Sequence, residues 1–90
     1  MKTRNIINSN NEDTSEPFAV AQHIILRNMW EYYLEEPDEN DIAFGYVMGF
    51  ANEWGNVDMK EIEPYIISKA WGTQLAEVMP PEGYYWEDES

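Results

Sequence analysis

Apolar residues recur at helical spacing from Ser15 onward. The recurring positions are Phe18, Ala21, Ile25, Met29 and Tyr32. Such a period of three to four residues is typical of an amphipathic helix. Ser15 or Glu16 is placed as the N-cap, and Pro17 falls in the first turn. Because Pro37 disfavours helical geometry in the residue before it, the pattern predicts a helix over residues 17–36.

A second stretch with the same period follows Asp38, which is placed as an N-cap. Its apolar positions are Ala43, Tyr46 or Val47, Phe50 and Trp54. The pattern predicts a helix over residues 40–54 that ends at Gly55. Gly45 and Gly49 share one face of this helix, and each costs about 1 kcal/mol relative to alanine. We therefore expect another helix to approach closely there, with a ligand touching the backbone as the alternative.

The remaining pattern is interrupted by Pro64. Asp58 and Glu61 have the spacing of a capping box, but a proline six residues after that cap cannot sit in an unbroken helix. The sequence predicts a short turn over 58–62, a helix from Pro64 to near Gly72, and a last helical turn before the Pro80-Pro81 pair. A β-strand over 64–71 is the rival interpretation, because its Tyr-Ile-Ile segment favours strand.

Taken together, these patterns predict an all-α fold, a small bundle of three or four helices in one domain of 90 residues. The helical domain spans residues 15–80. A mobile arm at 1–14 precedes it, in which a short strand at Ile6 and Ile7 is the alternative. An acidic-aromatic tail at 81–90 follows it.

Charge changes the functional picture more than the pattern does. Eighteen acidic residues against five Lys and Arg give a net charge of −13 and a pI near 4.1. Ordinary soluble domains intersperse both signs, whereas no Lys or Arg lies between residues 28 and 59. Such a field repels DNA and RNA and attracts basic protein surfaces, including the nucleic-acid channels of other proteins.

The densest acidic segment, from Glu35 to Asp41, does not have the spacing of a calcium site. An EF-hand loop needs glycine at its sixth position and glutamate at its twelfth. Counted from Asp38, the sixth residue is Ala43, and counted from Glu36 it is Asp41. We therefore expect weak cation attraction without a dedicated metal site.

The sequence offers little for catalysis or cofactor binding. His23 is the single histidine and cysteine is absent, so no usual metal or thiol constellation can form. Gly45 and Gly49 match neither a P-loop nor a dinucleotide-binding turn. Eighteen acids always supply carboxylate pairs, but nothing in the sequence marks one pair as buried. We expect no catalytic residue, no cofactor and no enzymatic activity.

In size, pI and mixture of acidic and aromatic residues, the chain is similar to phage-encoded acidic inhibitors that mimic nucleic acid. The resemblance implies an inhibitor that occupies the basic surface of a nucleic-acid-binding protein, for example an anti-restriction or anti-CRISPR factor. Carboxylates three or four apart on a predicted helix would lie about 5–6 Å from one another and could stand in for phosphates. The alternative is an interaction module or subunit that binds through an apolar or aromatic patch, with the charge serving solubility.

Two segments supply the candidate contact residues. In the tail, docking into the core and contact with a partner are both open, since Tyr and Trp are enriched at binding hot spots. The expected partner is a basic protein surface, with no direct nucleic acid and no membrane. No signal-peptide-like or membrane-spanning apolar run is present, so we expect a cytoplasmic protein, in the host cytoplasm if phage-encoded. The candidate residues are Glu31, Glu35, Glu36, Asp38, Glu39, Asp41, Tyr84, Tyr85, Trp86, Glu87 and Asp88.

Overall fold

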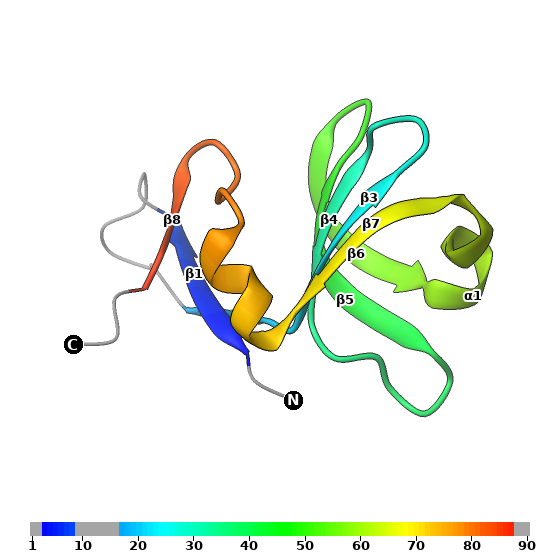
Figure 1. The fold of residues 1–90 in the computed structure, drawn as a ribbon, viewed down its shortest axis with the longest axis horizontal. Coiled ribbons are helices and arrows are strands. Elements are labelled where there is room, and N and C mark those ends of the chain that lie inside the picture. Colours follow the sequence, from blue (N-terminus) through cyan, green and yellow to red (C-terminus); the bar gives the residue numbers. More distant parts are fainter. Residues whose placement is uncertain (1–2, 9–16, 88–90) are drawn as a thin grey trace.

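Strands dominate the protein. The structure, a computed structural model, describes residues 3–8 and 17–87 (Figure 1). Of these residues, 52% are in strands and 17% in helices, and the strands form two antiparallel sheets. The all-α prediction is therefore wrong, and the description of the molecule as helical is wrong with it.

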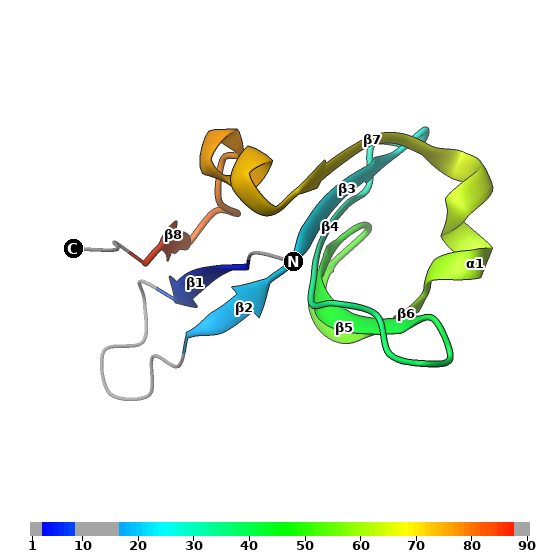
Figure 2. The ribbon, with the colours of Figure 1, turned by 60° about the horizontal axis from the view of Figure 1, so that its bottom comes forward.

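The larger sheet has five antiparallel strands in the order β6-β5-β4-β3-β7. Their bounds are β3 Gln22–Leu26, β4 Glu31–Leu34, β5 Ile42–Met48, β6 Asn52–Asp58 and β7 Ile66–Trp71. Four strands follow one another as a meander, and the last strand returns to pair with the first. Figure 2 shows the sheet curving around an interior, with the helical connection α1 (Met59–Ile62) and η1 (Glu63–Tyr65) between its two edge strands.

The smaller sheet brings the two ends of the chain together. β1 (Arg4–Asn8) lies in the middle, with β2 (Phe18–Val20) on one side and β8 (Tyr84–Trp86) on the other. The short strand considered at Ile6 and Ile7 is thus part of β1. Residues 1–2 and 9–14 of the predicted arm lie outside the described residues.

Two apolar cores cover the two faces of the larger sheet. Inside the curve, Ile24, Tyr32 and Leu34 pack with Val57 and Met59. A second core lies against the opposite face of the same strands. It holds Ile6, Val20, Tyr33, Tyr46, Leu75 and Trp86, with Leu75 contributed by the 3-10 helix η2 (Gly72–Glu77). The central strands are therefore buried on both faces.

Burial on both faces accounts for the wrong prediction over residues 17–36. A strand covered on both faces carries a near-continuous apolar run in place of strict alternation, and such a run also contains helical spacings. The segment in fact forms β2, β3 and β4. Met29, with φ of 70°, and Asn28, whose side chain accepts a hydrogen bond from the Trp30 N–H, form the turn between β3 and β4.

The predicted helix over 40–54 is wrong for a related reason. This segment forms β5, a turn and the first three residues of β6, so Gly45 and Gly49 share no helical face. Gly45 does meet a close neighbour, but that neighbour is the backbone of β4: a Cβ there would fall on the Tyr33 carbonyl oxygen and 2.8 Å from the Leu34 Cα. A Cβ on Gly49 would lie 2.7 Å from the Trp30 ring.

The C-terminal predictions fared unevenly. The short turn at 58–62 is confirmed as α1, with Asp58 as its N-cap accepting a hydrogen bond from the Lys60 N–H. The helix predicted from Pro64 is wrong, and the rival strand forms β7 after one 3-10 turn. The last helical turn is present as η2, which ends at Glu77, before the Pro80-Pro81 pair.

Gly45 and Gly55 face each other in the β5–β6 pair and provide a matched test of this packing. Gly45→Ala should lower the free energy of unfolding by about 1–3 kcal/mol, because the added methyl group meets backbone that cannot rotate away. Gly55→Ala meets nothing within 4 Å and should raise it by about 0.5–1 kcal/mol. Urea melts of both variants measure the difference. Equal effects would contradict the close approach of β4 to Gly45.

Candidate functional site

Aromatic side chains from both sheets meet on one side of the protein. This aromatic surface consists of Phe18, Phe44, Tyr46, Trp54 and Tyr84. β2 and β8 of the smaller sheet and β5 and β6 of the larger one supply them. The surface therefore bridges the border between the two sheets.

Phe44 and Trp54 form the exposed centre of the aromatic surface. Their rings are stacked, with centroids 5.9 Å apart and planes inclined by 17°. Phe18 packs its ring nearly at right angles to both, at 6.0 Å from Phe44 and 4.9 Å from Trp54. Phe44 remains 41% exposed and Trp54 42% exposed. Two large rings thus present apolar area to solvent on a supported platform.

Strand alternation places these rings on one face. Phe44 and Tyr46 are two residues apart on β5 and therefore point to the same side. Trp54 is the register partner of Tyr46 on β6. The helical interpretation assigned Trp54 to a core position and did not single out Phe44. A strand pattern over 42–48 was the signal that would have found the pair.

The residues from Glu35 to Asp41 connect β4 to β5, and we call them the acidic loop. Glu35, Glu36, Asp38 and Glu39 are exposed, and Asp41 is half-buried. The Asp38 carboxylate accepts hydrogen bonds from the Asn40 and Ile42 N–H groups at 2.8 and 3.0 Å. The Asp38 carboxylate thus holds the backbone of the loop in one conformation.

The acidic loop begins beside the aromatic surface. The Glu35 N–H donates to the carbonyl oxygen of Phe44 at 2.8 Å, so the loop begins at the residue directly across from Phe44. Asp41 lies at the other end of the loop with φ of 65°, and its carbonyl accepts from the Met59 N–H. The loop therefore runs from the aromatic surface to the start of α1.

The other predicted contact residues are divided among different environments. Trp86 is 9% exposed, and its indole N–H donates to the Val78 carbonyl at 2.7 Å, so this residue belongs to the core. Tyr84 joins the aromatic surface, whereas Tyr85 is 48% exposed. Glu87 accepts from the Asn5 side chain through a short hydrogen bond. Asp88 lies outside the described residues.

Charge compensation is sparse. Within residues 3–8 and 17–87, no salt bridge is formed by Lys or Arg, and His23 Nε2 lies 3.0 Å from Glu31 Oε1. Two of the basic side chains lie over aromatic rings: the Arg4 guanidinium 4.6 Å from the Trp86 ring centroid and the Lys69 ammonium 4.1 Å from that of Trp71. No Lys or Arg of the described residues forms a salt bridge with an exposed carboxylate of the acidic loop.

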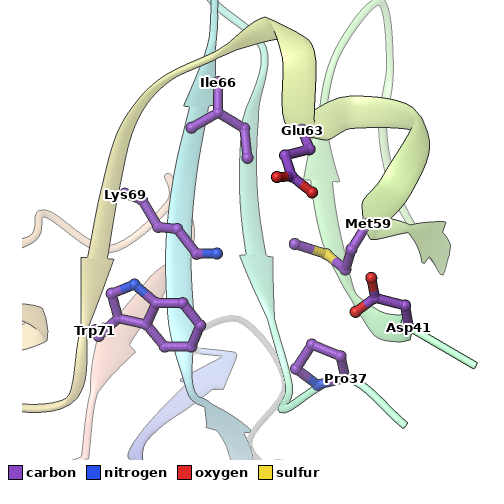
Figure 3. A pocket seen from close by; sticks show the side chains of 7 residues that line it. All are labelled: Pro37, Asp41, Met59, Glu63, Ile66, Lys69 and Trp71. Atoms are coloured by element: carbon purple, nitrogen blue, oxygen red, sulfur yellow. The ribbon is translucent and has the colours of Figure 1, made fainter. Parts of the chain in front are cut away.

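A cavity of about 410 Å³ opens beside the edge strand β7 of the larger sheet (Figure 3). β7, the α1–η1 connection and the acidic loop form its walls. Its lining residues are Pro37, Asp41, Met59, Glu63, Ile66, Lys69 and Trp71. The sequence interpretation did not bring these residues together, because Lys69 and Trp71 were expected on a helix.

Two further properties limit what the described chain can hold. Among residues 3–8 and 17–87, no group of three or more His, Asp or Glu side chains is placed to hold a metal ion. In the same part of the chain, no helix has the length and apolar character needed to cross a membrane.

Buried tyrosines in the two apolar cores predict a loss of stability in alkali. Burial raises the pKa of Tyr33 far above its usual value, and the neighbouring Glu31 carboxylate raises it further; burial also raises the pKa of Tyr32 and Tyr46. In the unfolded chain these pKa values return to about 10, so the folded state ionises its tyrosines less readily. The stability of the fold is therefore unaffected below about pH 10 and falls as the pH rises above it, because the unfolded chain then loses phenol protons that the folded state retains.

Urea melts from neutral to strongly alkaline pH measure this loss. Tyr33→Phe should weaken the pH dependence, at a cost of about 0.5–1.5 kcal/mol at neutral pH, since the phenol donates to the Met79 carbonyl at 2.8 Å. Tyr65→Phe, at an exposed position, is the control. A Tyr33→Phe variant with the full alkaline loss of the natural chain would contradict the assignment.

Comparison of the chain with protein-family models, with curated proteins and with solved structures finds no match in any of the three. What the aromatic surface, the acidic loop and the cavity do is therefore inferred from their own geometry and charge.

Proposed function

We propose that this protein is a non-enzymatic binding protein that docks on a basic surface of a partner protein. The aromatic surface forms the centre of the contact, and the carboxylates of the acidic loop form its charged rim. The single observation that carries the proposal is the exposed Phe44–Trp54 pair with uncompensated carboxylates beside it. A cytoplasmic location belongs to the same proposal.

The aromatic surface supports the proposal through its exposure and its rigidity. Phe44 and Trp54 lie on paired strands and are held from the side by Phe18. A partner that covers them gains apolar burial while little side-chain freedom is lost on binding. Aromatic anchors surrounded by polar residues are the usual composition of a binding hot spot.

The charge supports a basic partner in particular. Glu35, Glu36 and Glu39 are exposed on one short connection, in a chain whose net charge is −13. Carboxylates at the rim of an interface mainly raise the association rate and exclude acidic partners. Arginine fits both parts of the surface, because its guanidinium pairs with carboxylates and stacks on aromatic rings.

A more specific version is that the partner's basic surface binds nucleic acid, so that docking inhibits it by occupancy. The near absence of ion pairs in the described chain favours this version, since unpaired carboxylates are available to replace phosphates. The geometry differs from the expected one, because the densest acidic segment is a loop between strands and not a helix face. The interaction-module alternative needs the same aromatic surface but no competition with nucleic acid.

The proposal is tested by capturing the partner from a host lysate with the tagged protein and measuring the affinity of the purified pair. Phe44→Ser with Trp54→Ser should reduce the affinity by about 100-fold or more. Tyr85→Ser is the matched control, because it also removes an exposed aromatic ring, from β8 outside the aromatic surface. Undiminished binding by the double variant would refute docking through the aromatic surface.

The charge contribution is measured with a second pair of variants. Changing Glu35, Glu36 and Glu39 to Gln and Asp41 to Asn should weaken binding and flatten its salt dependence, which is expected to be about tenfold or more between about 50 and 200 mM salt. Four exposed acids elsewhere, changed to Gln, form the control with equal net charge: Glu53, Glu61, Glu77 and Glu82.

Competition with nucleic acid separates the two versions of the proposal. In the inhibitor version, DNA or RNA and this protein exclude each other from the partner, and the partner's activity falls as the complex forms. Simultaneous binding with undiminished affinity would reject the inhibitor version and leave the interaction module.

A further inference from the structure

The cavity beside β7 has opposite charges on opposite walls. Lys69 projects from β7, and Figure 3 shows its ammonium pointing into the cavity toward the wall that carries Glu63 and Asp41. No ion pair joins Lys69 to either carboxylate; its ammonium lies 4.1 Å from the Trp71 ring centroid. The two signs are thus held apart across a space of about 410 Å³.

The rest of the lining is apolar. Met59 and Pro37 lie on the wall opposite β7, and Ile66 and the Trp71 indole lie along β7 (Figure 3). A cavity of this size lies within the range of small-molecule sites, which combine apolar walls with a few convergent polar groups. The thioether of Met59 is flexible and adapts to the shape of an apolar group.

A buried polar group lies behind this lining. Gln22 on β3 is 0% exposed, and its Nε2 contacts the Met59 sulfur at 3.9 Å and donates to the Glu35 carbonyl at 3.3 Å. Its Oε1 is buried and has no hydrogen-bond partner in the described structure. An unpaired buried acceptor is costly, and Gln22 lies behind the Met59 wall without itself lining the cavity.

We propose that this cavity binds a small zwitterion with an apolar side chain, the chemical class of the free α-amino acids. The ligand carboxylate pairs with Lys69, and its ammonium lies against Glu63 and Asp41. Its side chain packs between Met59, Ile66 and the Trp71 ring. The two charges of the ligand match the two walls, whereas a simple anion meets the carboxylates and a simple cation meets the ammonium.

The proposal is tested by titrating the full chain with leucine and methionine at millimolar concentration, using calorimetry. Leucinamide lacks the carboxylate and N-acetyl-leucine lacks the ammonium, so each should bind about tenfold or more weakly than leucine. Lys69→Gln should lower leucine affinity while leaving leucinamide affinity unchanged. Glu63→Gln should lower leucine affinity while leaving N-acetyl-leucine affinity unchanged.

Lys60→Gln is the matched control, because it removes an exposed lysine from α1 that does not line the cavity. It should bind leucine as the natural chain does. Absence of leucine and methionine binding, equal binding of leucine and its two analogues, or an equal loss in Lys60→Gln and Lys69→Gln would each overturn the proposal. Circular dichroism of each variant confirms that the sheets are intact, so that a loss reports on the cavity.

Discussion

The rest of the structure depends on the burial of β3, β4 and β5 on both faces. One face curves around the core that contains Ile24 and Leu34, and the other packs against the small sheet through Tyr33 and Tyr46. A chain of 90 residues has too few apolar residues to build two independent domains, each with its own core. It covers both faces of the same strands because β1 and β8, from opposite ends of the chain, pair in one small sheet.

Both candidate sites lie where this coverage stops. The aromatic surface forms at the border between the sheets, where Phe44 and Trp54 extend past the residues that cover their neighbours. The cavity forms where α1 and η1 connect β6 to β7, the two edge strands, which are not paired with each other. The acidic loop reaches both places, with Glu35 bonded to Phe44 and Asp41 bonded to Met59.

Charge and apolar surface are therefore separated by topology. The strands bury or present aromatic side chains, while the densest acidic segment falls on a connection that can remain solvated. Concentrating carboxylates on this loop limits the desolvation that burial would impose on them. It also places negative charge near the stacked Phe44–Trp54 pair, which is the arrangement that the proposed basic and partly apolar partner surface requires.

Local chemistry was readable from the sequence where neighbours in the chain decide the outcome. Asp58 as an N-cap, the interruption at Pro64 and the break before Pro80 depend on residues within one or two turns, and the turn at α1 and the stop after η2 followed as expected. The density of uncompensated acids is likewise a property of the sequence alone. The predicted approach of a helix to Gly45 is wrong, because the close neighbour there is the β4 backbone.

Only the tertiary structure decided that the apolar segments are strands. Ile24 and Ile25 point to opposite faces of β3, and each face is covered by residues distant in the chain. Such two-sided burial erases the alternation by which a strand is recognised, so a helical period fitted the same residues. Strand register also decided which side chains share a site, and it is set by long-range pairing and burial. It stacks Phe44 on Trp54 and places Lys69 on the cavity wall opposite Glu63.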